Sequence, residues 1–363
     1  MNIKRSILST GMVVAVAIAL AGCSTAGNNT TPPATGGSTP AGGSTATLNT
    51  WMAPPKDGPY KVALSDSFTS NTWRAQVTME FNYYCQQNTS TISCLTPADA
   101  NSDTSTQISQ ITNFINQGAD IILIDANDGS ALNPVIQQAT QAGIQVVDFD
   151  NTTTSTYSIH VGEDQTEIGK QGADWLISQL KSGDSIISLD GITGNPTSDQ
   201  RQAGADAEFK AANINIVARG DTKWDKATAQ GLAMTLLTAN PNIQGIYSQG
   251  GDSSLGAIAA EQQLGMDPTK LPIPGEGSNG FLKTWQSLNL SSWAFSSPPQ
   301  LVVNALQTGI AARQGTDPGN TVNLDIPVIT QATLSQYVQP NLNDNLWLPT
   351  MLPDSVLQQN FSS

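Results

Sequence analysis

The chain of 363 residues is long enough for one large or two ordinary domains, and 38% of its residues are hydrophobic, as in a soluble globular protein. Its formal net charge of −14 and sequence pI of about 4.2 exclude a protein that coats nucleic acid, because an acidic surface repels phosphate. We therefore expect no nucleic-acid partner.

The first 22 residues have the pattern of an export signal. A basic start, residues 1–5, precedes an apolar stretch, residues 11–22, that is too short for an ordinary spanning helix. The stretch ends in "LAGC", which resembles a bacterial lipobox. This resemblance implies cleavage before Cys23, lipidation of Cys23 and anchoring to the cell membrane. An uncleaved membrane anchor is the alternative, and both place the remaining chain outside the cytoplasm.

Residues 23–57 are rich in Gly, Ser, Thr, Pro and Ala. Such a composition does not bury a core, so we predict a flexible tether that holds a folded domain near the membrane.

Beyond the tether, short apolar runs alternate with helical patterns, such as the stripe of Ile108, Ile111, Phe114 and Ile115. This alternation predicts an α/β fold with parallel sheets covered on both faces, and two series of similar size predict two doubly wound lobes. The predicted strands are residues 60–64, 91–95, 120–124, 144–149, 157–161, 185–189, 214–218 and 243–247.

Polar segments follow several predicted strands, where ligands bind in such sheets. They carry many hydroxyl, amide, carboxylate and guanidinium groups. These segments are residues 65–74, 148–151, 190–201, 247–254 and 294–300.

If Cys23 becomes the lipidated terminus, Cys85 and Cys94 remain as an even pair. In an oxidising compartment, two cysteines separated by a short loop favour a disulfide, which would stabilise the fold by about 2–3 kcal/mol. Two free buried thiols are the alternative.

Enzymatic and cofactor motifs are weak. "GEGSNG", residues 275–280, matches a dinucleotide pattern, but Pro274 is a poor lead-in from a central strand. "DANDG", residues 125–129, lacks the spacing and closing Glu of a calcium loop. The single histidine, His160, lies in a strand-like run, and no GxSxG is present. We predict no cofactor, no metal and no catalysis, although paired carboxylates leave a glycosidase open.

Four segments together resemble the ribose-binding-protein group, the substrate-binding proteins of sugar ABC transporters. They are "VALSDSFTSNTWR", "IQVVDFDN", "GITGNPTSDQRQAG" and "IYSQGGDSSLGAIAA", residues 62–74, 144–151, 191–204 and 246–260. The likeness covers residues 58 to about 335 and implies a type I periplasmic-binding-protein fold. The last residues, 342–363, lie outside it.

The resemblance also implies a domain division. The first lobe comprises residues 58–161 plus 298–323, and the second comprises 162–297 plus 324–363, including the C-terminal extension. The chain would cross between the lobes three times, near Gly162, Ser297 and Leu324, to form a hinge.

The resemblance assigns ligand contacts to both lobes. Ser67, Asn71, Trp73 and Arg74 match first-lobe contacts, and Asp150 matches a carboxylate that binds neighbouring hydroxyls. Arg201 and Trp224 match second-lobe contacts. A tryptophan suits the C–H face of a sugar, and Asp and Arg suit its hydroxyls. Alternatively, Trp73 and Trp224 are ordinary core or lid aromatics.

Four positions depart from the family pattern: Asn151 replaces arginine, Gly250 asparagine, Gly277 aspartate and Ser296 glutamine. Three of these changes shrink the side chain, so we expect a larger pocket or more contacts through water and backbone. Four other polar residues are candidates to replace the lost contacts: Gln249, Asp252, Glu276 and Asn279.

These features predict a monomeric, lipid-anchored protein that captures a sugar or sugar-like polyol and delivers it to the transmembrane subunits of an ABC permease. Two alternatives stay open, a sensor for a receptor kinase or chemoreceptor and a secreted carbohydrate-active enzyme. The lactose-repressor family shares the fold, but the export signal and the lack of a DNA-binding headpiece argue against it.

Overall fold

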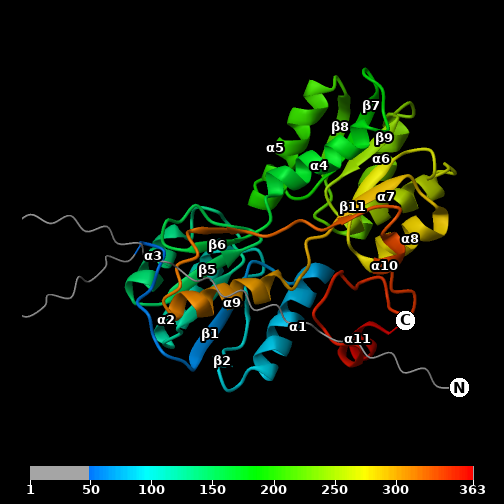
Figure 1. Cartoon of the computed structure of the whole chain (residues 1–363). Helices are drawn as coiled ribbons and strands as arrows, with labels where there is room; N and C mark the ends of the chain where they lie inside the picture. Colours follow the sequence, from blue (N-terminus) through cyan, green and yellow to red (C-terminus); the bar gives the residue numbers. More distant parts are fainter. Residues whose placement is uncertain (1–48, 363) are drawn as a thin grey trace, which may run out of the picture. The chain divides into compact units, whose positions relative to one another are not determined.

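The computed structural model describes residues 49–362 (Figure 1). These residues form an α/β fold with parallel sheets, as the sequence predicts. The predicted signal peptide, Cys23 and most of the predicted tether lie outside the described residues. No helix within residues 49–362 is long and apolar enough to cross a membrane.

The first lobe is built on a parallel sheet with the strand order β12-β6-β5-β4-β1-β2, and β3 also pairs with β1. Alternate residues of a strand enter different cores: Val62 and Leu64 pack with α1 and α9, whereas Ala63 packs with α2 and α3. Helices therefore cover both faces. The elements are β1 Tyr60–Asp66, α1 Thr72–Gln87, β2 Ile92–Cys94, β3 Ala98–Asp99, α2 Thr104–Asn116, β4 Ile121–Ile124, α3 Asn133–Gln141, β5 Gln145–Phe149, β6 Ile159–Gly162, α9 Leu301–Arg313 and β12 Thr321–Asn323.

The second lobe contains the sheets β8-β7-β9 and β10-β11-β13, of which only the β11–β13 pair is antiparallel. The backbone N–H of Ile246 donates to the carbonyl of Pro272 at 3.1 Å and joins the two sheets. The elements are α4 Gln165–Ile177, β7 Ser185–Asp190, α5 Pro196–Ala211, β8 Asn215–Asp221, α6 Lys226–Ala239, β9 Gly245–Ser248, α7 Gly251–Gln263, β10 Ile273–Glu276, α8 Asn279–Leu288, β11 Ser292–Phe295 and β13 Val328–Ile329.

Strand β10 runs through Pro274 but lies at the edge of its three-stranded sheet, the position at which a strand tolerates proline, so the strand that leads into "GEGSNG" is not a central one. The strand pairs in register with β11 on one side. Towards β9 the connecting bond uses the carbonyl of Pro272, and the carbonyl of Pro274 accepts a bond from Ser254 Oγ at 2.8 Å. The missing N–H of the proline therefore costs little.

Residues 49–57, which the composition assigns to the tether, pack against the first lobe instead. Ala53 is fully buried, and its N–H donates to Gln145 Oε1 at 3.1 Å. The side chain of Gln145 in turn donates to the carbonyl of Trp51 at 2.9 Å. Apolar side chains in this segment, such as Met52, anchor it in the first-lobe core.

Three segments link the elements of the two lobes: residues 163–164, 296–300 and 324–327. After them, the C-terminal extension, residues 342–362, contacts both lobes rather than the second alone. Its helix α11 (Asp354–Phe361) belongs to the same core as α8, and Met79 and Tyr83 of α1 pack against that core. Figure 1 shows this red segment between α1 and the short helix α10 (Leu334–Tyr337).

Cys85 and Cys94 form a disulfide that joins α1 to β2. The sequence leaves open a disulfide or two free thiols at these positions, and the structure has the disulfide.

Candidate functional site

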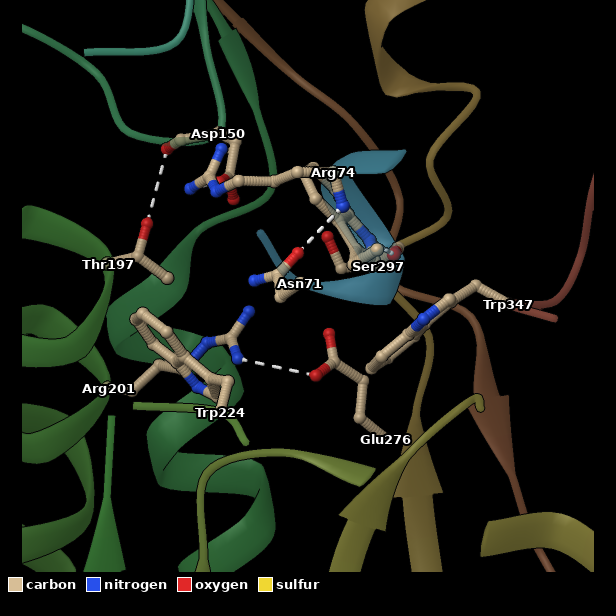
Figure 2. A pocket seen from close by; sticks show the side chains of 10 residues that line it. Asn71, Arg74, Asp150, Thr197, Arg201, Trp224, Glu276, Ser297 and Trp347 are labelled. Atoms are coloured by element: carbon tan, nitrogen blue, oxygen red, sulfur yellow. Dashed lines mark hydrogen bonds and ion pairs between the residues drawn. The ribbon is translucent and has the colours of Figure 1, made fainter. Parts of the chain in front are cut away.

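A pocket lies where the carboxyl ends of strands from both lobes meet, the position at which open α/β sheets bind ligands. About 430 Å³ of space, open solvent included, lies among its side chains. Figure 2 shows its side chains converging from several segments. The lining residues are Asn71, Trp73, Arg74, Asp150, Thr197, Arg201, Trp224, Glu276, Ser297 and Trp347.

The start of helix α1 forms one wall. The side-chain oxygen of Asn71 accepts a hydrogen bond from the Arg74 backbone N–H at 2.8 Å and caps the helix. Trp73 follows within the first turn, and its indole N–H donates to the carbonyl of Ser297 at 2.7 Å. Trp73 also belongs to the first-lobe core, so one side chain both fills the core and lines the pocket.

Arg74 is held among three carboxylates of the first lobe. It pairs with Asp125, lies 3.1 Å from Asp150 and lies 3.5 Å from Asp66, and the side chains of Arg74, Asp66 and Asp125 are almost fully buried. Burial raises the pKa of Asp66 to about 7 against the pull of Arg74, and the charges of Asp99 and Asp150 act in the same direction as burial. Arg74 also covers the ring of Phe68 at 4.5 Å. These contacts fix Arg74 rigidly in the wall.

Arg201 forms the opposite polar wall from helix α5. Its Nε donates to Gln165 Oε1 at 2.7 Å, and its Nη1 donates to the carbonyl of Gln249 at 2.8 Å. The guanidinium lies over the ring of Phe295 at 4.6 Å. Residues of α4, of β11 and of the loop after β9 therefore orient Arg201.

Glu276 lies beside Arg201, with its carboxylate oxygen 3.8 Å from Nη1 (Figure 2). Burial raises the pKa of Glu276 to about 8, and the nearby Asp150 and Glu163 act in the same direction. At neutral pH the Glu276 carboxyl group is therefore largely protonated and is able to donate as well as accept a hydrogen bond.

Trp224 occupies a strained backbone position after β8. Its φ is +51°, in the left-handed region that bulky residues rarely adopt. Two glycines lie against the indole: a Cβ at Gly191 would be 2.2 Å from Trp224 Cζ2, and one at Gly250 would be 2.7 Å from Cδ1. Asp150 also has a left-handed φ, of +54°. Such strain gathers where the surrounding structure fixes a side chain for function.

Half of the predicted contact residues line this pocket, namely Asn71, Trp73, Arg74, Asp150, Arg201 and Trp224. The other six are not among its lining residues, although Gly250 lies against the indole of Trp224: Ser67, Asn151, Gln249, Gly250, Gly277 and Ser296. Gln249 has a positioning role, since its carbonyl holds Arg201 and its side-chain oxygen accepts from Ser198 Oγ at 3.1 Å. Ser67 and Asn151 are almost fully buried.

The space left by the three small residues is filled, so these residues do not enlarge the pocket. Trp224 covers Gly250. The C-terminal extension covers the other two: a Cβ at Gly277 would lie 2.7 Å from the carbonyl oxygen of Leu348, and the Ser296 hydroxyl donates to that same oxygen. The alternative expectation, more contacts through water and backbone, stays a prediction.

Sequence reasoning missed Thr197, Ser297 and Trp347, while Glu276 was among its polar candidates. Of the other candidates, Asp252 in the second lobe accepts a hydrogen bond from Thr72 Oγ1 in the first lobe at 3.2 Å. The side chain of Asn279 instead donates to carbonyl oxygens that include that of Leu342 in the extension, at 3.1 Å. The small residues 277 and 296 were the only related signal, because their size left space to be filled, but size alone did not point to Trp347.

The model of the periplasmic binding protein domain family matches residues 62–317, which is most of the chain. The chain belongs to this family. Within residues 49–362, no cluster of three or more His, Cys, Asp or Glu side chains is arranged to hold a metal ion.

The chain is similar in sequence to several binding proteins, of which two are described here. The ribose import binding protein RbsB of Escherichia coli (strain K12) is 23% identical over 218 residues, 60% of this chain and 73% of that protein. The xylitol-binding protein of Mycolicibacterium smegmatis is 28% identical over 179 residues, 48% of this chain and 51% of that protein. The chain thus spans between half and three quarters of these relatives.

Among solved structures, the chain is similar to a periplasmic solute binding protein of an ABC transporter from Actinobacillus succinogenes 130z, which was solved with bound D-allose. The TM-score is 0.70 at 22% identity, over 77% of this chain and all of that one. This likeness shows the fold.

Proposed function

We propose that this protein is the extracytoplasmic solute-binding component of an ABC importer and that its ligand is a sugar or sugar-like polyol. One observation carries the proposal: the lining of the pocket combines three tryptophans with guanidinium, carboxyl and amide groups, and both lobes contribute to it. Aromatic faces suit the C–H groups of a sugar ring, and the polar rim suits its hydroxyls.

Binding rather than catalysis explains the geometry better. Arg74 and Arg201 are each fixed by several protein contacts, as expected for groups that hold a ligand in place. The relatives are named for binding and import, which supports the same role for this chain. Capture would involve both lobes, because Asp150 comes from the first and Arg201 from the second.

The finer parts of the proposal concern location and partners. The "LAGC" sequence supports lipidation at Cys23, and a monomer anchored by a tether would deliver its ligand to the permease subunits. Replacing Cys23 with Ala should abolish lipid labelling and release the protein from membranes. Unchanged labelling in that variant would contradict the anchor.

The central experiment is a thermal-shift screen of the purified protein with sugars, polyols and cyclitols, followed by calorimetric titration of every hit. We expect at least one compound to raise the melting temperature and to bind with 1:1 stoichiometry. Arg201→Met should weaken that binding by about tenfold or more, because ligand hydroxyls in the pocket would lose a charged partner. Absence of any hit, or product formation from glycosides, would contradict the proposal.

A further inference from the structure

We propose that the C-terminal extension completes the ligand-binding site and that its Trp347 determines which ligands fit. This inference rests on the proposed function, because it assigns a residue to the same pocket. Trp347 lies outside the region matched by the family model, residues 62–317, yet it lines the pocket. Figure 2 shows Trp347 and Trp224 on opposite sides of it.

The extension holds Trp347 firmly to the first lobe. The Trp347 backbone N–H donates to Gln76 Oε1 at 2.9 Å, and Gln76 Nε2 returns a bond to the Trp347 carbonyl at 3.1 Å. Thr350 donates to Glu80 Oε1 at 2.7 Å one turn further along α1. The Gln76 and Glu80 side chains are almost fully buried, so these bonds are shielded from water.

The residues on either side of Trp347 are bound to the second lobe. The carbonyl of Leu346 accepts from the Asn279 N–H at 2.7 Å, and the N–H of Leu348 donates to the Gly277 carbonyl at 2.9 Å. The backbone of the C-terminal extension has a strand-like conformation at Trp347, which pairs with Ser278 in an antiparallel bridge. Because successive residues of such a backbone point in opposite directions, they contact different lobes. Trp347 is thereby fixed at the boundary between the lobes, where a ligand would lie.

The indole of Trp347 presents an apolar surface to the pocket. Its N–H is already used, since it donates to Thr72 Oγ1 at 2.8 Å. Trp347 is 5% exposed and packs with the first-lobe core, so only the part of its carbon surface that lines the pocket remains for a ligand. Gly277 and Ser296 make room for the neighbouring Leu348 carbonyl, so the small residues at these positions and the tryptophan form one arrangement. The wall therefore favours a ligand with C–H groups on this side and limits its size.

The test is calorimetric titration of the wild type, Trp347→Ala, Trp347→Phe and Phe361→Ala with D-ribose, D-allose, xylitol and myo-inositol. Trp347→Ala should lower the affinity for the best-bound probe by about ten- to hundredfold, and Trp347→Phe should lower it by less. The ratio of D-allose to D-ribose affinity should rise by about tenfold in Trp347→Ala, because the opened wall admits the larger ring.

Phe361→Ala is the matched control from the same extension. Phe361 is buried with α8 and is not a lining residue, so its truncation should lower the melting temperature and leave the affinities unchanged. If Trp347→Ala does not fold, Gly277→Ala replaces it, because the added Cβ would displace the Leu348 carbonyl and the adjoining Trp347. Gly277→Ala should give the same loss of affinity.

Two results would overturn the inference. Wild-type affinities and an unchanged ratio in a folded Trp347→Ala or Gly277→Ala protein would show that the extension is structural only. A wild type that binds none of the four probes and gives no hit in the screen of sugars, polyols and cyclitols would contradict the proposed function, and the inference with it. The first result is read from the variants and the second from the wild type alone, so the two failures are distinguishable.

Discussion

The contact between Gly191 and Trp224 makes a sharp prediction about the pocket. A Cβ at Gly191 would lie 2.2 Å from Trp224 Cζ2 and 2.5 Å from Cε2. Carbon atoms in contact prefer about 3.5–4.0 Å, so Gly191→Ala requires the indole to move by more than about 1 Å. Trp224 is only partly buried, so it has room to move away without disrupting a core.

We expect Gly191→Ala to weaken binding of the best ligand by about ten- to hundredfold. This loss corresponds to about 1–3 kcal/mol of stacking free energy that the displaced indole no longer contributes. The melting temperature of the ligand-free protein should change little. Calorimetric titration beside melting curves measures both quantities. Gly231→Ala is the matched control, since a Cβ there meets no atom within 4 Å, and in helix α6 it should add about 0.5–1 kcal/mol of stability.

The double variant Gly191→Ala/Trp224→Ala decides whether the glycine acts through the tryptophan. If it does, the double variant should bind no more weakly than Trp224→Ala alone, because the displaced group is already gone. Additive losses in the double variant, or wild-type affinity in Gly191→Ala, would refute the reasoning.

Two further predictions concern stability. Glu261 is fully buried and its carboxylate oxygens have no hydrogen-bond partner within residues 49–362, and burial raises its pKa from 4.5 to about 8. Because the folded state keeps this proton to higher pH, the contribution of Glu261 to the free energy of unfolding is greatest below pH 4.5 and falls as the pH rises towards 8. Glu261→Gln should therefore raise the melting temperature at pH 8 by several degrees and change it little at pH 4; equal effects at both would contradict this origin. Reducing the Cys85–Cys94 disulfide should lower the free energy of unfolding by about 2–3 kcal/mol, measured in denaturant with and without reductant. Recovery of both cysteines as free thiols by peptide mapping of unreduced protein would exclude the bridge.

The sequence by itself was sufficient for the fold class and for part of the site. Apolar runs such as residues 120–124 mark buried parallel strands because every residue of β4 is buried, and this requirement is local to each strand. The segment that holds Asn71, Trp73 and Arg74 was found for a similar reason, and the family resemblance then singled out these residues within it. They directly follow β1, and the carboxyl end of a strand is where this fold binds ligands.

Only the tertiary structure decided how the remaining space is filled. Gly250, Gly277 and Ser296 are small in the sequence, and smallness alone does not say which neighbour takes the space. Trp224 and the carbonyl of Leu348 do so, and the extension that carries Leu348 also brings Trp347 into the pocket. Trp347 lies 271 residues from its partner Gln76 along the chain. A contact of that range leaves no periodic pattern, because it depends on the packing of elements rather than on neighbours in the chain.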